Sequence, residues 1–144
     1  MNQYEKKRIE KAFTWVQKKL KTNYNLIFQQ FKAANDKDVS PDTHLAVVRS
    51  NRATEDPNCF IVYFDVNNIK SRSFAFLKQD AIHEVLHMIS WTRREIFEST
   101  VQHVRSSKLK ADLKKRFYDS DEAVTYLLER TFGPFVIKAW KDEG

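Results

Sequence analysis

The 144-residue chain contains little glycine, proline or cysteine, with two Gly, three Pro and one Cys. Glycine-rich phosphate loops need several glycines close together, so nucleotide-binding loops of that kind are excluded. Cys59 has no partner for an internal disulfide, which is typical of a reducing compartment. The sequence has no apolar run long enough to cross a membrane and no signal-peptide pattern, so we expect a cytoplasmic protein without a membrane partner.

The segment His83-Glu84-Val85-Leu86-His87 places two imidazoles four residues apart, with a carboxylate beside the first. In a helix, residues i and i+4 share one face, so both rings can reach one metal ion, and Zn²⁺ is the metal expected. Glu84 lies off that position and is expected to take a proton from a metal-bound water, as in metal-assisted hydrolysis. The same letters also arise by chance on a buried helix, where each His satisfies only its own hydrogen bonds.

The residues around the motif predict a long, buried helix. It starts near Phe74, with Ser71 or Ser73 as the N-cap. Apolar residues that recur at helical spacing are expected to form its inward face. They are Ile82, Val85, Leu86, Ile89 and Ile96.

A catalytic zinc site needs a third protein ligand and an open fourth position for water. Arg93 stands where a metzincin carries its third His, so that class is excluded. His103 follows His87 at a separation similar to that in SprT-like DNA-repair proteases, but the Gly-Pro expected after it is absent. In an unbroken helix the two His would be about 24 Å apart, so this alternative requires a break near Ser99-Thr100.

Glu122 is the favoured third ligand. It belongs to a segment, residues 119–129, that predicts a second helix returning against the first, and an inward-facing Glu there would reach the metal. The alternative is a helix cap, with Asp119 as N-cap and Glu122 at the third helical position. Asp121 and Glu129 are the other candidate ligands on this helix.

With this motif and a downstream Asp-Glu-Ala-Val at 121–124, the chain resembles the gluzincin zinc metallopeptidases, particularly compact ImmA/IrrE-like and phage-encoded members. The resemblance covers residues 74 to about 140, and no Glu-x-x-x-Asp pattern follows, since position 126 is Tyr. It implies a protein or peptide substrate, zinc ligation by His83, His87 and Glu122, and general acid/base catalysis by Glu84.

Tyr126 follows Glu122 by four residues and would share its helix face. A phenol at that position can donate a hydrogen bond to the oxyanion that develops during peptide hydrolysis. Core packing is the alternative role for this side chain.

The whole chain, residues 1–144, predicts one α+β domain with a zincin-like order of long N-terminal helix, small sheet, metal helix and return helix. Apolar spacing predicts the first helix over residues 4–34, with an interruption only near Thr22-Asn23. Residues 45–49 and 60–66 predict strands joined by a loop over 51–58. The second is either an edge strand that holds an extended peptide or a buried central strand.

The end of the chain predicts a break in the return helix. Gly133 supplies a left-handed cap and Pro134 cannot continue the helix. Residues 136–140 are then expected to pack back on the domain.

The formal net charge is +6, and the basic residues gather in two stretches. Such surfaces bind nucleic acid or an acidic protein, although lysine-rich helices are also ordinary solvated faces. Three functions remain open: a cytosolic zinc peptidase, a SprT-like DNA-associated protease, and a catalytically silent zincin scaffold that binds a protein. The basic stretches comprise Lys6, Lys7, Arg8 and Lys11, and Arg105, Lys108, Lys110, Lys114, Lys115 and Arg116.

Overall fold

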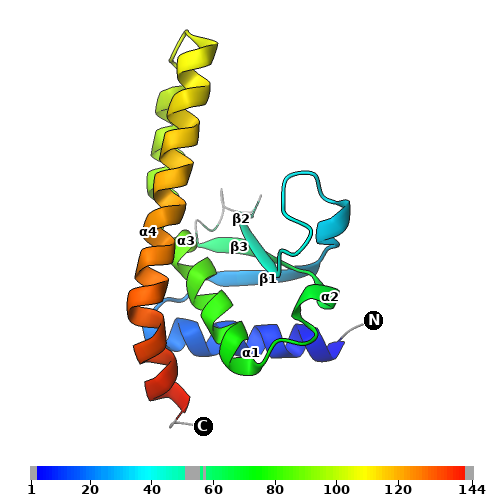
Figure 1. Cartoon of the computed structure of the whole chain (residues 1–144). Helices are drawn as coiled ribbons and strands as arrows, with labels where there is room; N and C mark the ends of the chain where they lie inside the picture. The colour runs from blue at the N-terminus through cyan, green and yellow to red at the C-terminus, as the bar shows by residue number, and fades with distance from the viewer. Residues whose placement is uncertain (1–2, 51–55, 57, 142–144) are drawn as a thin grey trace.

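The computed structural model describes residues 3–50, 56 and 58–141, and it confirms the predicted α+β class (Figure 1). Its strands are β1 (Asn25–Gln30), β2 (Leu45–Arg49) and β3 (Cys59–Phe64). Its helices are α1 (Gln3–Leu20), the short 3-10 helix η1 (Ala33–Asn35), α2 (Val66–Ile69), α3 (Phe74–Val101) and α4 (Ser107–Lys141). Most of the predicted loop 51–58 lies outside the described residues.

The central strand of the sheet is β3, which pairs in parallel with β1 and antiparallel with β2. The interpretation of residues 60–66 as an edge strand is therefore wrong, and β2 is the edge that faces the helix pair α3–α4. The strand is also shorter than predicted, because the Asp65 side chain accepts hydrogen bonds from the backbone of Asn67 and Asn68 and starts α2.

The core lies between one face of the sheet and the helices α1 and α3. Alternate residues of β3 point into it: Phe60, Val62 and Phe64 are all at most 3% exposed. Figure 1 shows α1 running beneath the sheet, where Phe13 and Val16 join the same cluster. No helix in the described part of the chain is both long and apolar enough to span a membrane.

The first helix is shorter than the predicted span of residues 4–34. It ends at Leu20, because Lys21 adopts a left-handed conformation (φ 56°) and the Thr22 N–H bonds the Gln17 carbonyl. The Gln17 side chain then receives the Tyr24 N–H at 2.7 Å and donates to the Tyr24 carbonyl at 3.1 Å. These bonds turn the chain into β1, so the apolar residues after Tyr24 follow strand alternation.

Helix α3 begins as predicted, with Ser73 as N-cap accepting a hydrogen bond from the Phe76 N–H. Its inward face is only partly the predicted one. Ile82 and Val85 are buried and Leu86 packs against the core, but Ile89 and Ile96 are 51% and 63% exposed. Ile96 lies where the helix has continued past the core, whereas near Ile89 it is Met88 and Trp91 that face the core.

Helix α4 begins at Ser107 rather than near Asp119, so Asp119 is not an N-cap and Glu122 lies well inside the helix. The helix also continues through Gly133 and Pro134 to Lys141, which contradicts the predicted break. The Gly-Pro pair carries a local penalty of about 4 kcal/mol in a helix interior. Side chains of residues 136–140, predicted to pack back, lie outside the described part.

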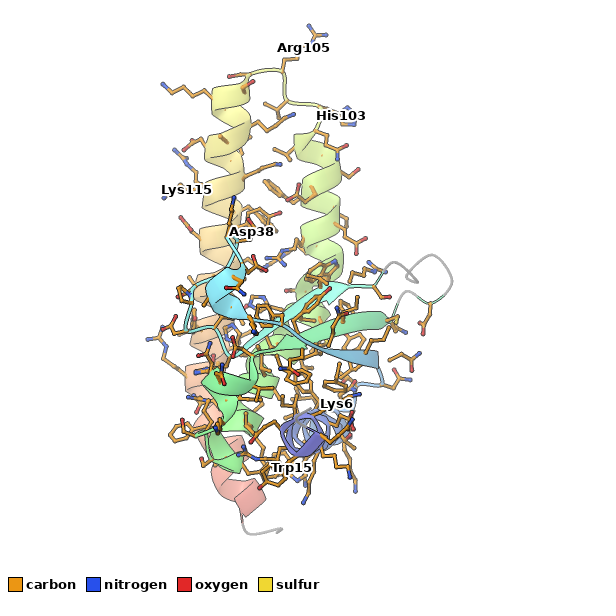
Figure 2. All side chains as sticks on the ribbon, turned by 90° about the vertical axis from the view of Figure 1, so that its right-hand side faces the viewer. Lys6, Trp15, Asp38, His103, Arg105 and Lys115 are labelled. Atoms are coloured by element: carbon orange, nitrogen blue, oxygen red, sulfur yellow. The ribbon has the colours of Figure 1, made fainter. Side chains whose placement is uncertain are left out.

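Helices α3 and α4 run antiparallel and project together beyond the sheet, as Figure 2 shows. We call residues 97–117 the outer arm. It includes the turn that carries His103 and Arg105 at its tip (Figure 2). The Phe97 and Phe117 rings stack at 4.1 Å with an interplanar angle of 4° and so hold the two helices of the arm together.

Candidate metal centre

Three ligand atoms from two helices converge at the inner part of the α3–α4 pair. His83 and His87 lie one turn apart on α3, and Glu122 faces them from α4. The His83 and His87 Nε2 atoms are 3.2 Å apart. The Glu122 carboxylate lies 3.2 Å from His83 Nε2 and 3.1 Å from His87 Nε2. The structure therefore brings together the three residues that the sequence predicted as metal ligands.

The geometry of this triad fits zinc. Ligands at about 2.0–2.1 Å from a tetrahedral Zn²⁺ lie about 3.3 Å from one another. The two Nε2 atoms match this separation, Glu122 approaches each ring with a different carboxylate oxygen, and one ligand atom from each residue lies within 4.8 Å of the others. Two imidazoles and a carboxylate also form the donor set of catalytic zinc sites, in which the fourth position is open. The side of the triad away from the core opens into a cleft of about 670 Å³, which leaves room for water and substrate.

Glu129, which the sequence analysis gave as an alternative ligand, contacts the His83 ring on its Nδ1 side, away from Glu122. Its carboxylate is 2.7 Å from His83 Nδ1, and it accepts a second hydrogen bond from Gln79 Nε2 at 3.2 Å. With Nδ1 as donor to Glu129, His83 Nε2 faces His87 and Glu122, where its lone pair would serve a metal once the proton is lost. A carboxylate behind a ligating His fixes the tautomer and the ring orientation in this way.

Asp121, the other alternative ligand, occupies a corresponding place behind His87. It is 3% exposed, and its carboxylate lies 3.7 Å from His87 Nδ1 and is paired with Arg93. Within the described residues, the buried Nδ1 of His87 has no hydrogen-bond partner, so Asp121 acts on the ring by charge. Both fallback candidates thus support the histidines instead of joining the triad.

Glu84 is 8% exposed and lines the same cleft as the triad. Burial raises the pKa of its carboxyl to about 7, and the neighbouring His83 and His87 oppose that rise. A carboxylate with this pKa can both accept and return a proton near neutral pH.

The triad residues influence each other's protonation. Burial opposes the charged form of His83, but hydrogen bonds to Glu122 and Glu129 and the charge of Glu84 outweigh it, and the pKa of His83 rises to about 9. Hydrogen bonds from His83 and His87 hold the pKa of Glu122 well below its usual range. Without a metal, the site therefore holds a proton in the place where a cation would bind.

Tyr126 lies on the predicted helix face, with its ring centroid 4.8 Å from that of His83. The side chain is 46% exposed and lines the cleft, so it is not part of the packed core. Burial and the nearby Glu122 and Glu129 charges raise the pKa of its phenol, which keeps the hydroxyl protonated as a hydrogen-bond donor.

His103 lies far from the triad. Helix α3 continues unbroken through Ser99-Thr100 to Val101, and His103 is exposed in the turn at the tip of the outer arm (Figure 2). The sequence alternative that used His103 as the third ligand required a helix break that does not occur.

The sequence did not indicate which other segments form the cleft. One wall is the edge strand β2, with Leu45 to Val47, and another is the loop before it, which includes Asp38 (Figure 2) and His44. Farther along α3, Arg94 lines the cleft as well. The sequence could have predicted that Arg94 shares the helix face of His87, because it follows His87 by seven residues and so lies two turns away.

No protein-family model, curated protein or solved structure matches this chain. The likeness to compact gluzincins therefore depends on the His83-Glu84-x-x-His87 motif and on Glu122. Function has to be inferred from the chemistry of the side chains around the cleft.

Proposed function

We propose that this protein is a zinc-dependent metallopeptidase with a compact, gluzincin-like site. One observation carries the proposal: one ligand atom each from His83, His87 and Glu122 lies within 4.8 Å of the others, while Glu84 lies buried beside them in an open cleft. Zinc at such a site supplies a bound water whose pKa falls to about 7. The remaining steps belong to the side chains and backbone around it.

Glu84 is the proton carrier in this proposal. It is not among the three proposed ligands, and its carboxylate beside them can accept a proton from the attacking water and deliver it to the leaving amine. Tyr126 donates its hydroxyl hydrogen to the oxyanion that forms on the substrate carbonyl. Glu129 keeps the His83 ring oriented through its hydrogen bond, and the Asp121 carboxylate lies near the His87 ring.

The edge strand β2 supports a peptide as the substrate. It pairs with β3 on one side only among the described strands, and residues Leu45 to Val47 line the cleft next to the triad. Its free backbone groups can pair with an extended chain, which is a general mode of peptide recognition. The buried, unpaired Cys59 agrees with a cytoplasmic site of action.

The test begins with metal content. Wild-type protein, His87→Ala, Glu122→Ala and the control His103→Ala are purified without added metal and measured by elemental analysis. We expect about one zinc per chain in the wild type and in His103→Ala, and strong loss in the other two. A wild type without zinc affinity would overturn the proposal.

Turnover is tested next with a mixed peptide library and detection of products by mass spectrometry. We expect the zinc-loaded wild type to cleave peptides and Glu84→Gln to retain zinc but lose cleavage by roughly a thousandfold or more. Equal cleavage by both proteins would exclude Glu84 as the proton carrier. Zinc binding without any cleavage by the wild type would identify a silent scaffold instead of an enzyme.

A further inference from the structure

Arg94 is held rigidly beside the cleft by two aromatic rings. Its guanidinium carbon lies 4.8 Å from the Trp91 ring centroid on the same helix and 5.0 Å from that of Tyr118 on α4. Stacking of this kind favours a fixed plane for the guanidinium.

This cation lacks a carboxylate partner among the described residues. Its Nε is buried and has no hydrogen-bond partner there. The acidic residues that follow it on α3 are already paired, Glu95 with Arg49 and Glu98 with Lys114 at 3.7 Å. Because Arg94 lines the cleft without a carboxylate of its own among the described residues, a carboxylate that reaches the guanidinium from the cleft would be stabilised by charge-assisted hydrogen bonds.

The distance from the triad sets where such a carboxylate would lie on a bound peptide. Arg94 lines the same cleft as His87 and lies seven residues farther along α3, about 10 Å along the helix axis. An extended peptide advances about 3.3 Å per residue, so this distance corresponds to about three residues. The pairing of Arg49 with Glu95 places the end of β2 beside the same point.

We propose that Arg94 is a specificity-determining residue that binds a carboxylate of the substrate about three residues from the cleaved bond. The proposal rests on the proposed peptidase function and names its substrate class, peptides with an acidic group at that distance. The carboxylate comes either from a Glu or Asp side chain or from the C-terminus of the peptide, and Arg94 binds both through the same two-pronged hydrogen bonding.

The experiment uses N-acetylated, C-amidated decapeptides in which one Gln is replaced by Glu at successive positions, together with the all-Gln peptide carrying a free C-terminus. We measure kcat/KM for zinc-loaded wild type, Arg94→Gln, Arg94→Lys and the control Arg105→Gln at the tip of the outer arm. In the wild type we expect a preference of roughly 10- to 100-fold for Glu over Gln about three residues from the cleaved bond.

The preference should fall to about one in Arg94→Gln, persist in part in Arg94→Lys, and remain unchanged in Arg105→Gln. Preference for the free C-terminus over the amide would identify the terminal carboxylate as the ligand. Preference for an internal Glu would identify a side chain. A wild type without acid preference, or an Arg94→Gln variant that keeps it, would overturn the role of Arg94.

Binding of the same peptides to zinc-loaded Glu84→Gln, with and without Arg94→Gln, separates this proposal from the proposed function. If the wild type cleaves nothing but binding of the Glu peptide still depends on Arg94, the peptidase proposal fails and the acid site stands. If peptides are cleaved or bound without acid preference, the acid site fails and the peptidase proposal is unaffected.

Discussion

The inner half of the α3–α4 pair and its outer arm differ sharply, although the same two helices form both. The inner half buries Glu84, His87, Asp121 and Glu129, each at most 8% exposed. The outer arm carries six basic and two acidic side chains, and its ion pairs, such as Lys114 with Glu98, join partly exposed groups. Charge is therefore concentrated in the interior at one end of the pair and solvated at the other.

The comparison shows in which half of the helix pair the side chains lower the stability of the fold. Removing charges from water is costly even when they are paired, and the inner half buries the carboxylates of Glu84, Asp121 and Glu129 around two imidazoles. Exposed pairs like those of the arm contribute about 0–1 kcal/mol each. An arrangement as costly as the inner one is expected where a ligand compensates for it, which is why we assign function to that half.

The largest difference between the two halves is expected in zinc affinity, when one histidine is removed from each half in turn. His83→Ala should lower zinc affinity by roughly a thousandfold, because it removes one of three ligands. His103→Ala, in the arm, should leave the affinity unchanged. Competition with a coloured zinc chelator measures both, and equal affinities would place the metal elsewhere.

Zinc affinity should also depend steeply on pH. The metal must displace the proton of His83, whose pKa in the metal-free protein is about 9, so affinity should rise about tenfold per pH unit up to about pH 9. The same shift stabilises the metal-free fold below pH 6.5, and that contribution is lost as the pH rises to about 9. Chelator competition from pH 6 to 10 tests this, and a flat profile above pH 7 would contradict it.

Glu84→Gln should stabilise the metal-free protein while it abolishes catalysis. The folded-state pKa of Glu84, about 7, exceeds its ordinary value of 4.5. The native state thus loses stability as the pH rises from 4.5 to 7 and stays penalised above that. The neutral Gln removes a penalty of up to about 3 kcal/mol at pH 8.

Chemical denaturation of the metal-free proteins at pH 8 and pH 4 measures the effect of Glu84→Gln. Its gain in unfolding free energy should shrink at the lower pH. The matched control is Glu98→Gln in the outer arm, which should change stability by less than about 1 kcal/mol at both values. A Glu84→Gln variant that is less stable at pH 8 would contradict the buried-charge explanation.

Glu129→Gln tests the support of the site without removing His83, His87 or Glu122. Loss of the carboxylate behind His83 should lower zinc affinity by roughly 10- to 100-fold, because the ring becomes less basic and less well oriented. Glu98→Gln again serves as the control in the outer arm and should have no effect. Unchanged affinity in Glu129→Gln would mean that the 2.7 Å contact is incidental.

The proximity of His83, His87 and Glu122 was predictable from sequence. Helix geometry alone puts His83 and His87 on one face, because they are four residues apart. Glu122 required only that a second helix return alongside. The strand β1 was not predictable, since Gln17 diverts the chain through hydrogen bonds to Tyr24 that no periodicity records. The edge position of β2 depends on how distant segments pack, which spacing along one chain does not encode.

The smallest effect is expected in the outer arm. Arg116 pairs with Asp112 at 3.2 Å on the same helix, and both side chains are at least half exposed. Arg116→Ala should therefore change the free energy of unfolding by no more than about 0.5 kcal/mol and leave zinc affinity unaffected. Denaturation at low and high salt tests this, since a weak surface pair also loses its contribution as salt rises. A loss above 1 kcal/mol would show that the arm is coupled to the core, and the division between a costly inner half and a solvated arm would no longer hold.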